Sequence, residues 1–206
     1  TTEEMEKARS EIQRFINAKK PEETVFTKNT TEGLNLVYNS IHLKKGDAII
    51  TTDKEHNSNL LPAQMLVKNR GAVHIVAPTA SAESPEFPLD KLSELLSKNK
   101  NVKLVSMAGT SNLDGTTVPI KEIAKRVHES SGLLMIDGAQ HVPHHETDVR
   151  RLGVDFLAFS GHKMMGPSGT GVLYGREELL NDLPPFLTGG ETVTDSTYTT
   201  AQFEKA

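Results

Sequence analysis

The feature that most constrains the fold of this chain is a regular alternation between short apolar runs and longer segments of helical periodicity. The apolar runs, which we expect to be strands, lie at residues 24–27, 48–51, 73–76, 102–107, 133–137, 156–160 and 171–174. Between most of them, apolar residues recur three or four positions apart, as Leu89, Leu92 and Leu96 do. Short buried strands that alternate with helices are typical of a mostly parallel sheet with helices on both faces. The pattern predicts an α/β protein, and we expect its 206 residues to form one domain.

The two ends of the chain depart from this alternation. Residues 5–16 carry apolar side chains at helical spacing, which predicts an amphipathic helix that ends near Lys20 and has no strand before it. At the other end, Pro184 interrupts the pattern, and the threonine-rich stretch 192–200 has no strong periodicity.

Composition narrows the class of protein. The net charge of −4 provides no basic field for nucleic acid, and no apolar run is long enough to cross a membrane. The chain contains no cysteine, so it can form neither a disulfide nor a cysteine-based metal site. Its first residues do not read as a secretory signal, which makes a cytoplasmic location the expectation.

Lys163 is the most informative single residue, because it follows an apolar run that ends in small and polar residues. There a buried amine would be presented to a carbonyl cofactor as a Schiff base. Most lysines are solvated surface groups, so the residue indicates little by itself. Several polar residues upstream also fall at the ends of predicted strands, where open parallel sheets bind ligands. Together they predict a cofactor pocket.

The Thr30-Thr31 pair and Asp137 each have a functional and a structural interpretation. The hydroxyls of Thr30 and Thr31 precede a predicted helix and could hold a phosphate there, or one of them could simply cap the helix. Asp137 ends a buried run, and its carboxylate needs a donor or a cation. A protonated pyridine nitrogen would serve, and so would a structural hydrogen bond or a helix cap.

The remaining polar candidates, taken one by one, are weaker evidence for a cofactor pocket. His56 could lie over an aromatic cofactor or move a proton, although a loop histidine is usually just solvated. Asn112 and Gln140 could donate amide hydrogens to a phenolate oxygen. Ser160 and His162 could add phosphate donors beside Lys163.

Two further clusters are candidates for other chemistry. His141, His144 and His145 lie near two acidic residues, but no histidine pair four residues apart frames a glutamate, so we do not expect a metal site. The glycines in 166–171 match neither a phosphate-binding loop nor a dinucleotide fingerprint, and we expect them to let the backbone turn tightly after the lysine.

Five motifs follow one another along the chain: Phe26-Thr27-Lys28-Asn29-Thr30-Thr31-Glu32, Glu55-His56-Asn57, Ser111-Asn112, Asp137-Gly138-Ala139-Gln140 and Ser160-Gly161-His162-Lys163. In order and spacing they resemble the pyridoxal-phosphate domain of the class V aminotransferase family, above all cysteine desulfurases and selenocysteine lyases. The resemblance extends over essentially all of residues 1–206. It implies the large domain of a fold-type-I pyridoxal-phosphate transferase, with pyridoxal 5′-phosphate as cofactor.

The resemblance also implies roles for individual residues. Lys163 would bind the cofactor as a Schiff base and move a proton, and Asp137 would pair with the pyridinium nitrogen. His56 would stack on the ring as a second catalytic residue, while Gln140 and Asn112 would contact the phenolate oxygen. The residues implied to hold the phosphate are Thr30, Thr31, Ser160 and His162.

Family enzymes of this type release sulfur or selenium from cysteine or selenocysteine and leave alanine. They use an acceptor cysteine and a substrate-binding arginine in their C-terminal third, and this chain has no cysteine. We therefore expect a fragment, truncated at both ends and without the C-terminal small domain. The resemblance implies a homodimer, in which a threonine or serine from the stretch 192–200 would reach the neighbour's phosphate, and a possible sulfur-acceptor protein.

Four alternatives remain open from the sequence. A related class V aminotransferase, an epimerase or a kynureninase-like enzyme would need no cysteine. An inactive, truncated and dimerising scaffold would need no chemistry at all.

Overall fold

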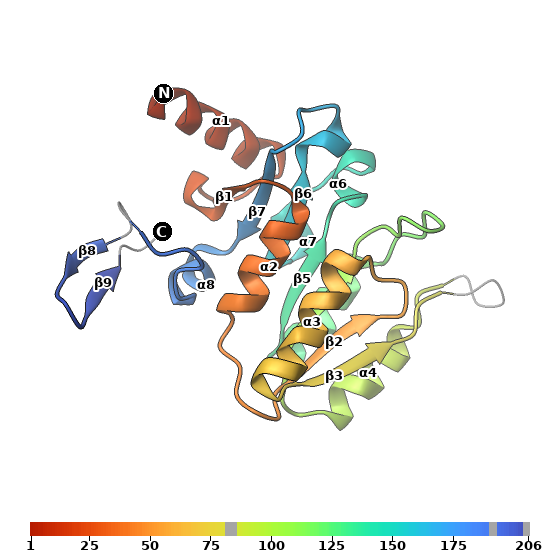
Figure 1. Cartoon of the computed structure of the whole chain (residues 1–206). Coiled ribbons are helices and arrows are strands. Elements are labelled where there is room, and N and C mark those ends of the chain that lie inside the picture. The colour runs from red at the N-terminus through yellow and green to blue at the C-terminus, as the bar shows by residue number, and fades with distance from the viewer. Residues whose placement is uncertain (81–85, 190–192, 204–206) are drawn as a thin grey trace.

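A central seven-stranded sheet forms the body of the molecule in this computed structural model, which describes residues 1–80, 86–189 and 193–203 (Figure 1). The strand order is β1-β7-β6-β5-β4-β2-β3. The strands are β1 (Thr24–Thr27), β2 (Ala48–Thr52), β3 (Val73–Ala77), β4 (Val102–Ala108), β5 (Leu133–Asp137), β6 (Phe156–Ser160) and β7 (Gly171–Gly175). Strands β2 to β6 are mutually parallel, while β7 is antiparallel to both of its neighbours, β6 and β1. The prediction of a mostly parallel sheet is confirmed.

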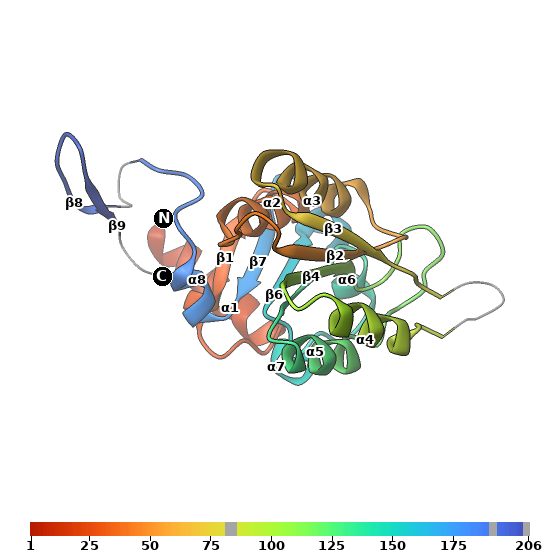
Figure 2. The same cartoon turned by 90° about the horizontal axis from the view of Figure 1, so that it is seen from below.

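Helices cover both faces of the sheet (Figure 2). On one face lie α2 (Thr30–Ser40) and α3 (Asn57–Arg70), with the short α8 (Glu177–Asp182) beside them. On the other lie α1 (Thr2–Phe15), α4 (Leu89–Lys98), α5 (Ile120–Glu129) and α7 (Val149–Leu152). The short helix α6 (His141–His144) follows β5.

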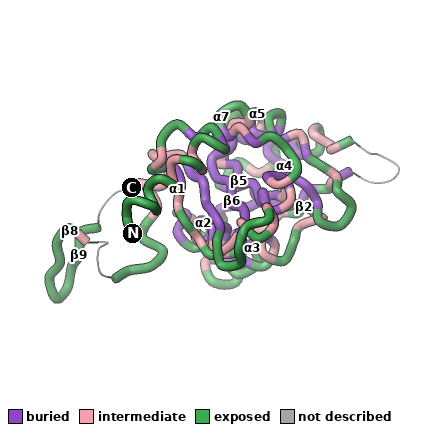
Figure 3. Tube along the Cα trace, turned by 90° about the horizontal axis from the view of Figure 1, so that it is seen from above, coloured by how far each residue is buried: buried purple, intermediate pink, exposed green. Residues whose placement is uncertain are grey.

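Alternation of side chains along the buried strands produces two hydrophobic cores. On β2, Ile49 packs against the α2 and α3 side and Ile50 against the opposite side, and neither is exposed. On β5, Met135 and Ile136 divide between the two cores in the same way. Because successive strand residues point to opposite faces, a strand buried on both faces must be apolar at every position. Figure 3 shows the result, with buried residues concentrated in the sheet.

The first helix ends earlier than the sequence pattern predicts. Helix α1 ends at Phe15 rather than near Lys20, because Asn17 adopts the left-handed conformation with φ of 52°. The Ala18 amide then donates to the Gln13 carbonyl, as in a typical helix C-cap in which asparagine takes the left-handed position. This turn brings Ile16 into the core, where it is fully buried.

The threonine-rich end contains a short hairpin of β8 (Val193–Ser196) and β9 (Ala201–Phe203), which the periodicity did not predict. The Thr197 amide donates to the Thr200 carbonyl and closes the turn. Nearly all of its side chains are exposed. Of the stretch 192–200, Thr192 lies outside the described residues. Among the described residues, no helix has both the length and the apolarity to cross a membrane.

Candidate active site

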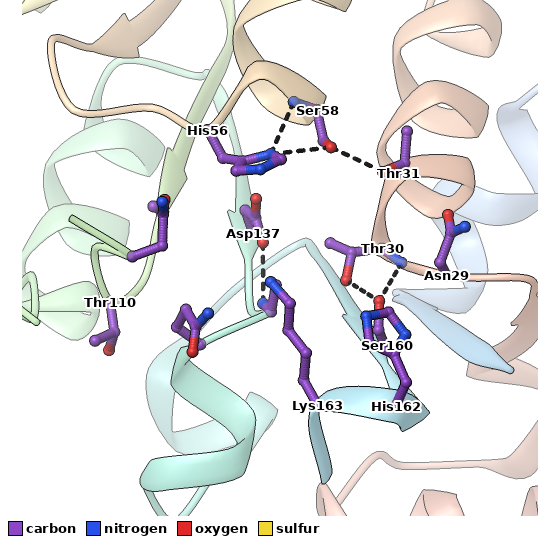
Figure 4. Close-up of a pocket in the computed structure, with 14 residues that line it drawn as sticks. Asn29, Thr30, Thr31, His56, Ser58, Thr110, Asp137, Ser160, His162 and Lys163 are labelled. Carbon is purple, nitrogen blue, oxygen red and sulfur yellow. Dashed lines mark hydrogen bonds between the residues drawn. The ribbon is translucent and has the colours of Figure 1, made fainter. Parts of the chain in front are cut away.

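A cavity of about 260 Å³ opens at the carboxyl ends of the parallel strands (Figure 4). Loops that follow β1, β2, β4, β5 and β6 all contribute to it, because parallel strands end at one edge of the sheet. The structure brings together every residue that the sequence predicts for the site, since all of them line this cavity: Thr30, Thr31, His56, Asn112, Asp137, Gln140, Ser160, His162 and Lys163.

The first turn of α2 forms one side of the cavity. The helix cap is Asn29, whose side-chain oxygen accepts from the Glu32 amide at 2.9 Å, so the interpretation of Thr30 or Thr31 as the cap is wrong. The Thr30 amide donates to Ser160 Oγ at 2.8 Å, and the Thr30 and Ser160 hydroxyls are 2.6 Å apart. This side therefore presents hydroxyls and a helix N-terminus, a combination suited to an anion.

Asp137 lies between His56 and Lys163 in Figure 4, at the end of β5. Its side chain is 4% exposed, and Oδ1 accepts from the Ala139 amide at 2.9 Å. The structural hydrogen bond considered from the sequence therefore exists. Burial raises the pKa of Asp137, while this amide, Lys163 and His56 oppose the rise. Oδ2 has no hydrogen bond to any described residue, so a cationic donor in the cavity would have a partner there.

His56 is exposed, yet it is not the freely solvated loop histidine of the alternative interpretation. It is the N-cap of α3, and its Nδ1 accepts from the Ser58 amide at 3.1 Å. Ser58 Oγ lies 3.0 Å from the same nitrogen and 2.8 Å from Thr31 Oγ1. Because Nδ1 accepts a backbone N–H, the ring is held in one orientation with its face toward Asp137 (Figure 4).

Lys163 lies in a single turn of 3-10 helix, Gly161–Met164, directly after β6. A β-carbon on Gly161 would come within 2.3 Å of Thr170 Oγ1, and Met165 is left-handed with φ of 60°. The tight turn predicted after the lysine is confirmed, although it already begins at Gly161. Within the described residues the Lys163 ammonium has no hydrogen bond or ion pair. It is therefore available to a ligand.

Asn112 and Gln140 also line the cavity. Asn112 lies in the loop between β4 and α5, and Gln140 precedes α6. Their side-chain amides make no hydrogen bond to other described residues. Two amide groups are thus free to donate to an oxygen in the cavity.

Sequence reasoning missed several residues that line or support the cavity. Asn29, Ser58, Ala108, Thr110 and Ala139 also line it. Asn29 was detectable, because asparagine before a helical run is a strong cap signal.

Glu55 belongs to one of the five motifs, but the sequence assigned it no role, because that role depends on tertiary contacts. Its carboxylate accepts hydrogen bonds from Thr52 Oγ1, from Asn59 Nδ2 at 2.7 Å and from the Ala108 amide at 3.0 Å. It therefore joins the ends of β2 and β4 to the first turn of α3. Burial outweighs these donors and raises its pKa to about 7.

The histidines after Asp137 do not converge on a common point. His141 and His145 stack with ring centroids 4.8 Å apart, whereas His144 Nδ1 lies 2.7 Å from the Gln140 carbonyl oxygen. In the part of the chain that the structure describes, no group of three or more histidine and acidic side chains is arranged to hold a metal.

Comparison with known proteins agrees with the geometry. The family model Aminotransferase class-V matches residues 1–206. A cysteine desulfurase of Cronobacter sakazakii is 42% identical over 195 residues, which cover 93% of this chain and 47% of that protein. A cysteine desulfurase of Serratia proteamaculans is 43% identical over 197 residues, again 93% and 47%. The chain spans about half the length of these relatives.

Solved structures give the same result. The cysteine desulfurase CsdA from Escherichia coli superposes with a TM-score of 0.92 at 34% identity, covering 100% of this chain and 51% of that one. A mutant of C-DES with glycine covalently linked to its PLP cofactor superposes with a TM-score of 0.84 at 25% identity, covering 96% and 52%.

Proposed function

This chain belongs to the aminotransferase class-V family, and from that membership we propose that it is the pyridoxal-phosphate-binding part of a cysteine desulfurase-like enzyme. The observation that carries the proposal is the buried Asp137 between His56 and Lys163, in a cavity whose other side is the hydroxyl-lined start of α2. The domain that contains these residues is proposed to extend over residues 1–206.

The residues of the cavity fit the cofactor group by group. Its phosphate would bind Thr30, Thr31, Ser160 and His162, where hydroxyls meet a helix N-terminus. Its ring nitrogen would pair with the carboxylate of Asp137, which has one oxygen without a hydrogen-bonding partner among the described residues. Asn112 and Gln140 would donate to its phenolate oxygen.

When bound, pyridoxal phosphate supplies a carbonyl for an amine and an electron sink for a carbanion. The chain supplies the rest of the chemistry. Lys163 Nζ is the amine that would hold the cofactor and later move a proton at the substrate's α-carbon. His56, with Nδ1 already accepting from the Ser58 amide, would cover the ring with a fixed imidazole face. Asp137, ionised by a cationic partner, would keep the ring electron-poor.

For the complete enzyme we propose cysteine or selenocysteine as substrate and alanine as a product. The acceptor cysteine and the small domain would come from segments outside this chain, which has no cysteine. A homodimer, a sulfur-acceptor protein and a cytoplasmic location belong to the same proposal. An aminotransferase of the same fold would be distinguished by formation of a keto acid instead of alanine.

The test is a visible spectrum of the purified chain with added pyridoxal phosphate, followed by borohydride reduction and peptide mapping. We expect a yellow band and a label on Lys163 alone. The Lys163→Ala variant should lose both, and Lys103→Ala, at an exposed lysine, should lose neither. Label scattered over several lysines would contradict the assignment and favour the scaffold alternative.

A further inference from the structure

The loop that carries Asn112 is closed at its neck by backbone hydrogen bonds. The Ser111 amide donates to the Thr116 carbonyl at 2.9 Å, and the Val118 amide donates to the Gly109 carbonyl at 3.0 Å. Thr110 and Thr117 form an isolated antiparallel bridge, and their hydroxyls are 3.0 Å apart. Two other contacts attach the ends of this loop to its surroundings. The Gly109 amide donates to the Asp137 carbonyl at 2.9 Å, and Lys54 Nζ lies 2.6 Å from Asp114 Oδ2.

Two histidines from the neighbouring segment connect the two threonines of the neck to the residues that follow Gln140. His141 Nδ1 lies 3.3 Å from Thr110 Oγ1, and His145 Nε2 lies 3.2 Å from Thr117 Oγ1. The two imidazoles stack on each other at 4.8 Å with an angle of 26° between their planes. Each histidine thus binds one threonine of the neck, and the stacking joins the two contacts into one unit, which we call the Thr–His clasp.

The position of the clasp links it to the cavity. His141 directly follows Gln140, and Thr110 is two residues before Asn112. Thr110 itself lines the cavity, on the side opposite Thr30 and Ser160 (Figure 4). The clasp therefore connects the segment of Asn112 to the segment of Gln140, the two residues whose side-chain amides are free to donate into the cavity.

Burial restricts both the position and the protonation state of the His141 ring. Its side chain is 5% exposed, and a β-carbon on Gly109 would lie only 3.0 Å from it, so the ring has little room to move. Burial, with a smaller contribution from His145, lowers the pKa of His141 to about 4. The imidazole is consequently neutral near pH 7, and its contact with Thr110 is a neutral hydrogen bond.

We propose that His141 and His145 are positioning residues, which hold the Asn112 loop against α6 so that Asn112 and Gln140 face the cavity as a pair. This inference rests on the proposed function only where it concerns the cofactor's phenolate oxygen. The clasp itself can be tested without cofactor.

The test is amide hydrogen exchange of the neck in the unliganded chain, read at Ser111 and Val118. Thr110→Val and Thr117→Val remove a hydroxyl at nearly constant shape, and Thr110→Ser and Thr117→Ser keep it. We expect exchange about fivefold faster in each valine variant, the factor for loss of one net hydrogen bond, and no more than twofold in the serine variants. Thr51→Val is the matched control, because it removes a hydroxyl that lies 2.8 Å from His74 Nε2, outside the clasp.

A double-mutant comparison shows whether the histidine acts through the threonine. His145 is exposed, so His145→Ala is expected to fold, and it should raise exchange as Thr117→Val does. The double variant should be no faster than the faster single variant. Exchange in the valine variants at the wild-type rate would overturn the clasp. Exchange that is as fast in the serine variants as in the valine variants would overturn it too.

The second measurement follows the cofactor band in the loaded protein against pH. In the valine variants we expect its midpoint to shift by about 0.5 pH unit or more, since a donor to the phenolate oxygen is displaced. Thr51→Val should leave it unchanged. If the valine variants exchange faster but the midpoint of the cofactor band is unchanged, the clasp does not position Asn112 and Gln140. A wild-type chain with no band would instead refute the proposed function, and the exchange rates would still decide the clasp.

Discussion

At the scale of single residues, Asp137 is the side chain whose charge should respond most to a ligand. Burial raises its pKa because the charged form lacks solvent, and a cation beside its second oxygen would reverse that effect. We predict that Asp137→Asn weakens pyridoxal-phosphate binding at least tenfold, measured by fluorescence titration. Asn at this position keeps the acceptor for the Ala139 amide, so circular dichroism should show an unchanged fold. Wild-type affinity in this variant would contradict the pairing with the ring nitrogen.

Glu55 provides a prediction about pH. Its folded pKa of about 7 lies above the ordinary value of 4.5, so between these two pH values the folded state binds the proton more than the unfolded state does. The contribution of Glu55 is therefore fully present below about pH 4.5 and is lost as pH rises through about 7, a loss of up to about 3 kcal/mol in the free energy of unfolding.

The measurement is urea unfolding at pH 5 and pH 8. Because other ionisable groups also contribute to the pH dependence of stability, the readout is the difference between wild type and Glu55→Gln. We expect the wild type to lose more stability between the two pH values than the variant does. Equal losses would show that Glu55 is ionised in the folded protein throughout this range.

Much of the site was predictable residue by residue, because each predicted side chain follows a strand whose apolar pattern is clear. The motif around Asp137 shows this: four apolar residues precede it, so it had to arrive at the sheet edge. Ser58, Glu55 and His141 were not predictable in the same way. Their roles come from contacts with residues 27 to 53 positions away, and one sequence does not reveal such contacts.

At the scale of elements, the close approach of β7 to the start of α2 determines where Asn29 lies. A β-carbon on Gly171 would be 2.6 Å from the Asn29 Cα, a backbone atom that cannot rotate away. We predict that Gly171→Ala destabilises the fold by about 1–3 kcal/mol in chemical unfolding, and also weakens phosphate binding because Asn29 caps α2.

Gly189→Ala is the control for that substitution, because a β-carbon there meets no atom of the described residues within 4 Å. It should leave the unfolding free energy within about 0.5 kcal/mol of wild type. A Gly171→Ala variant as stable as this control would mean that the β7 backbone can shift without cost.

The strands of the central sheet matched their predicted positions within one residue, because strands buried on both faces are continuous apolar runs. The antiparallel direction of β7 was not predicted. Strand β7 has five residues, all of them buried, and such a run has the same sequence pattern in a parallel and in an antiparallel strand. The early end of α1 was detectable from Asn17, while the β8–β9 hairpin, exposed and short, carries no apolar pattern to detect.

At the scale of the whole molecule, α3 presents apolar side chains to solvent. Leu61 is 50% exposed and Met65 is 48% exposed, and both line a groove of about 600 Å³ between α2 and α3. Thr31 and Ser58 line the groove as well as the cavity, so the groove adjoins the candidate active site. Contiguous apolar surface of this kind favours association.

We predict that the chain self-associates through this face, with a mass by light scattering of at least twice its 22.5 kDa. Met65→Glu should lower the mass toward that of a monomer, because a charge would be buried in the contact. Met5→Glu on α1 is the matched control, since Met5 is also 48% exposed but lies on the opposite side of the sheet from α3. A monomer at every concentration would refute self-association. If both substitutions lowered the mass equally, the chain would still self-associate, but α3 would not be the contact. The groove would then be free for another occupant.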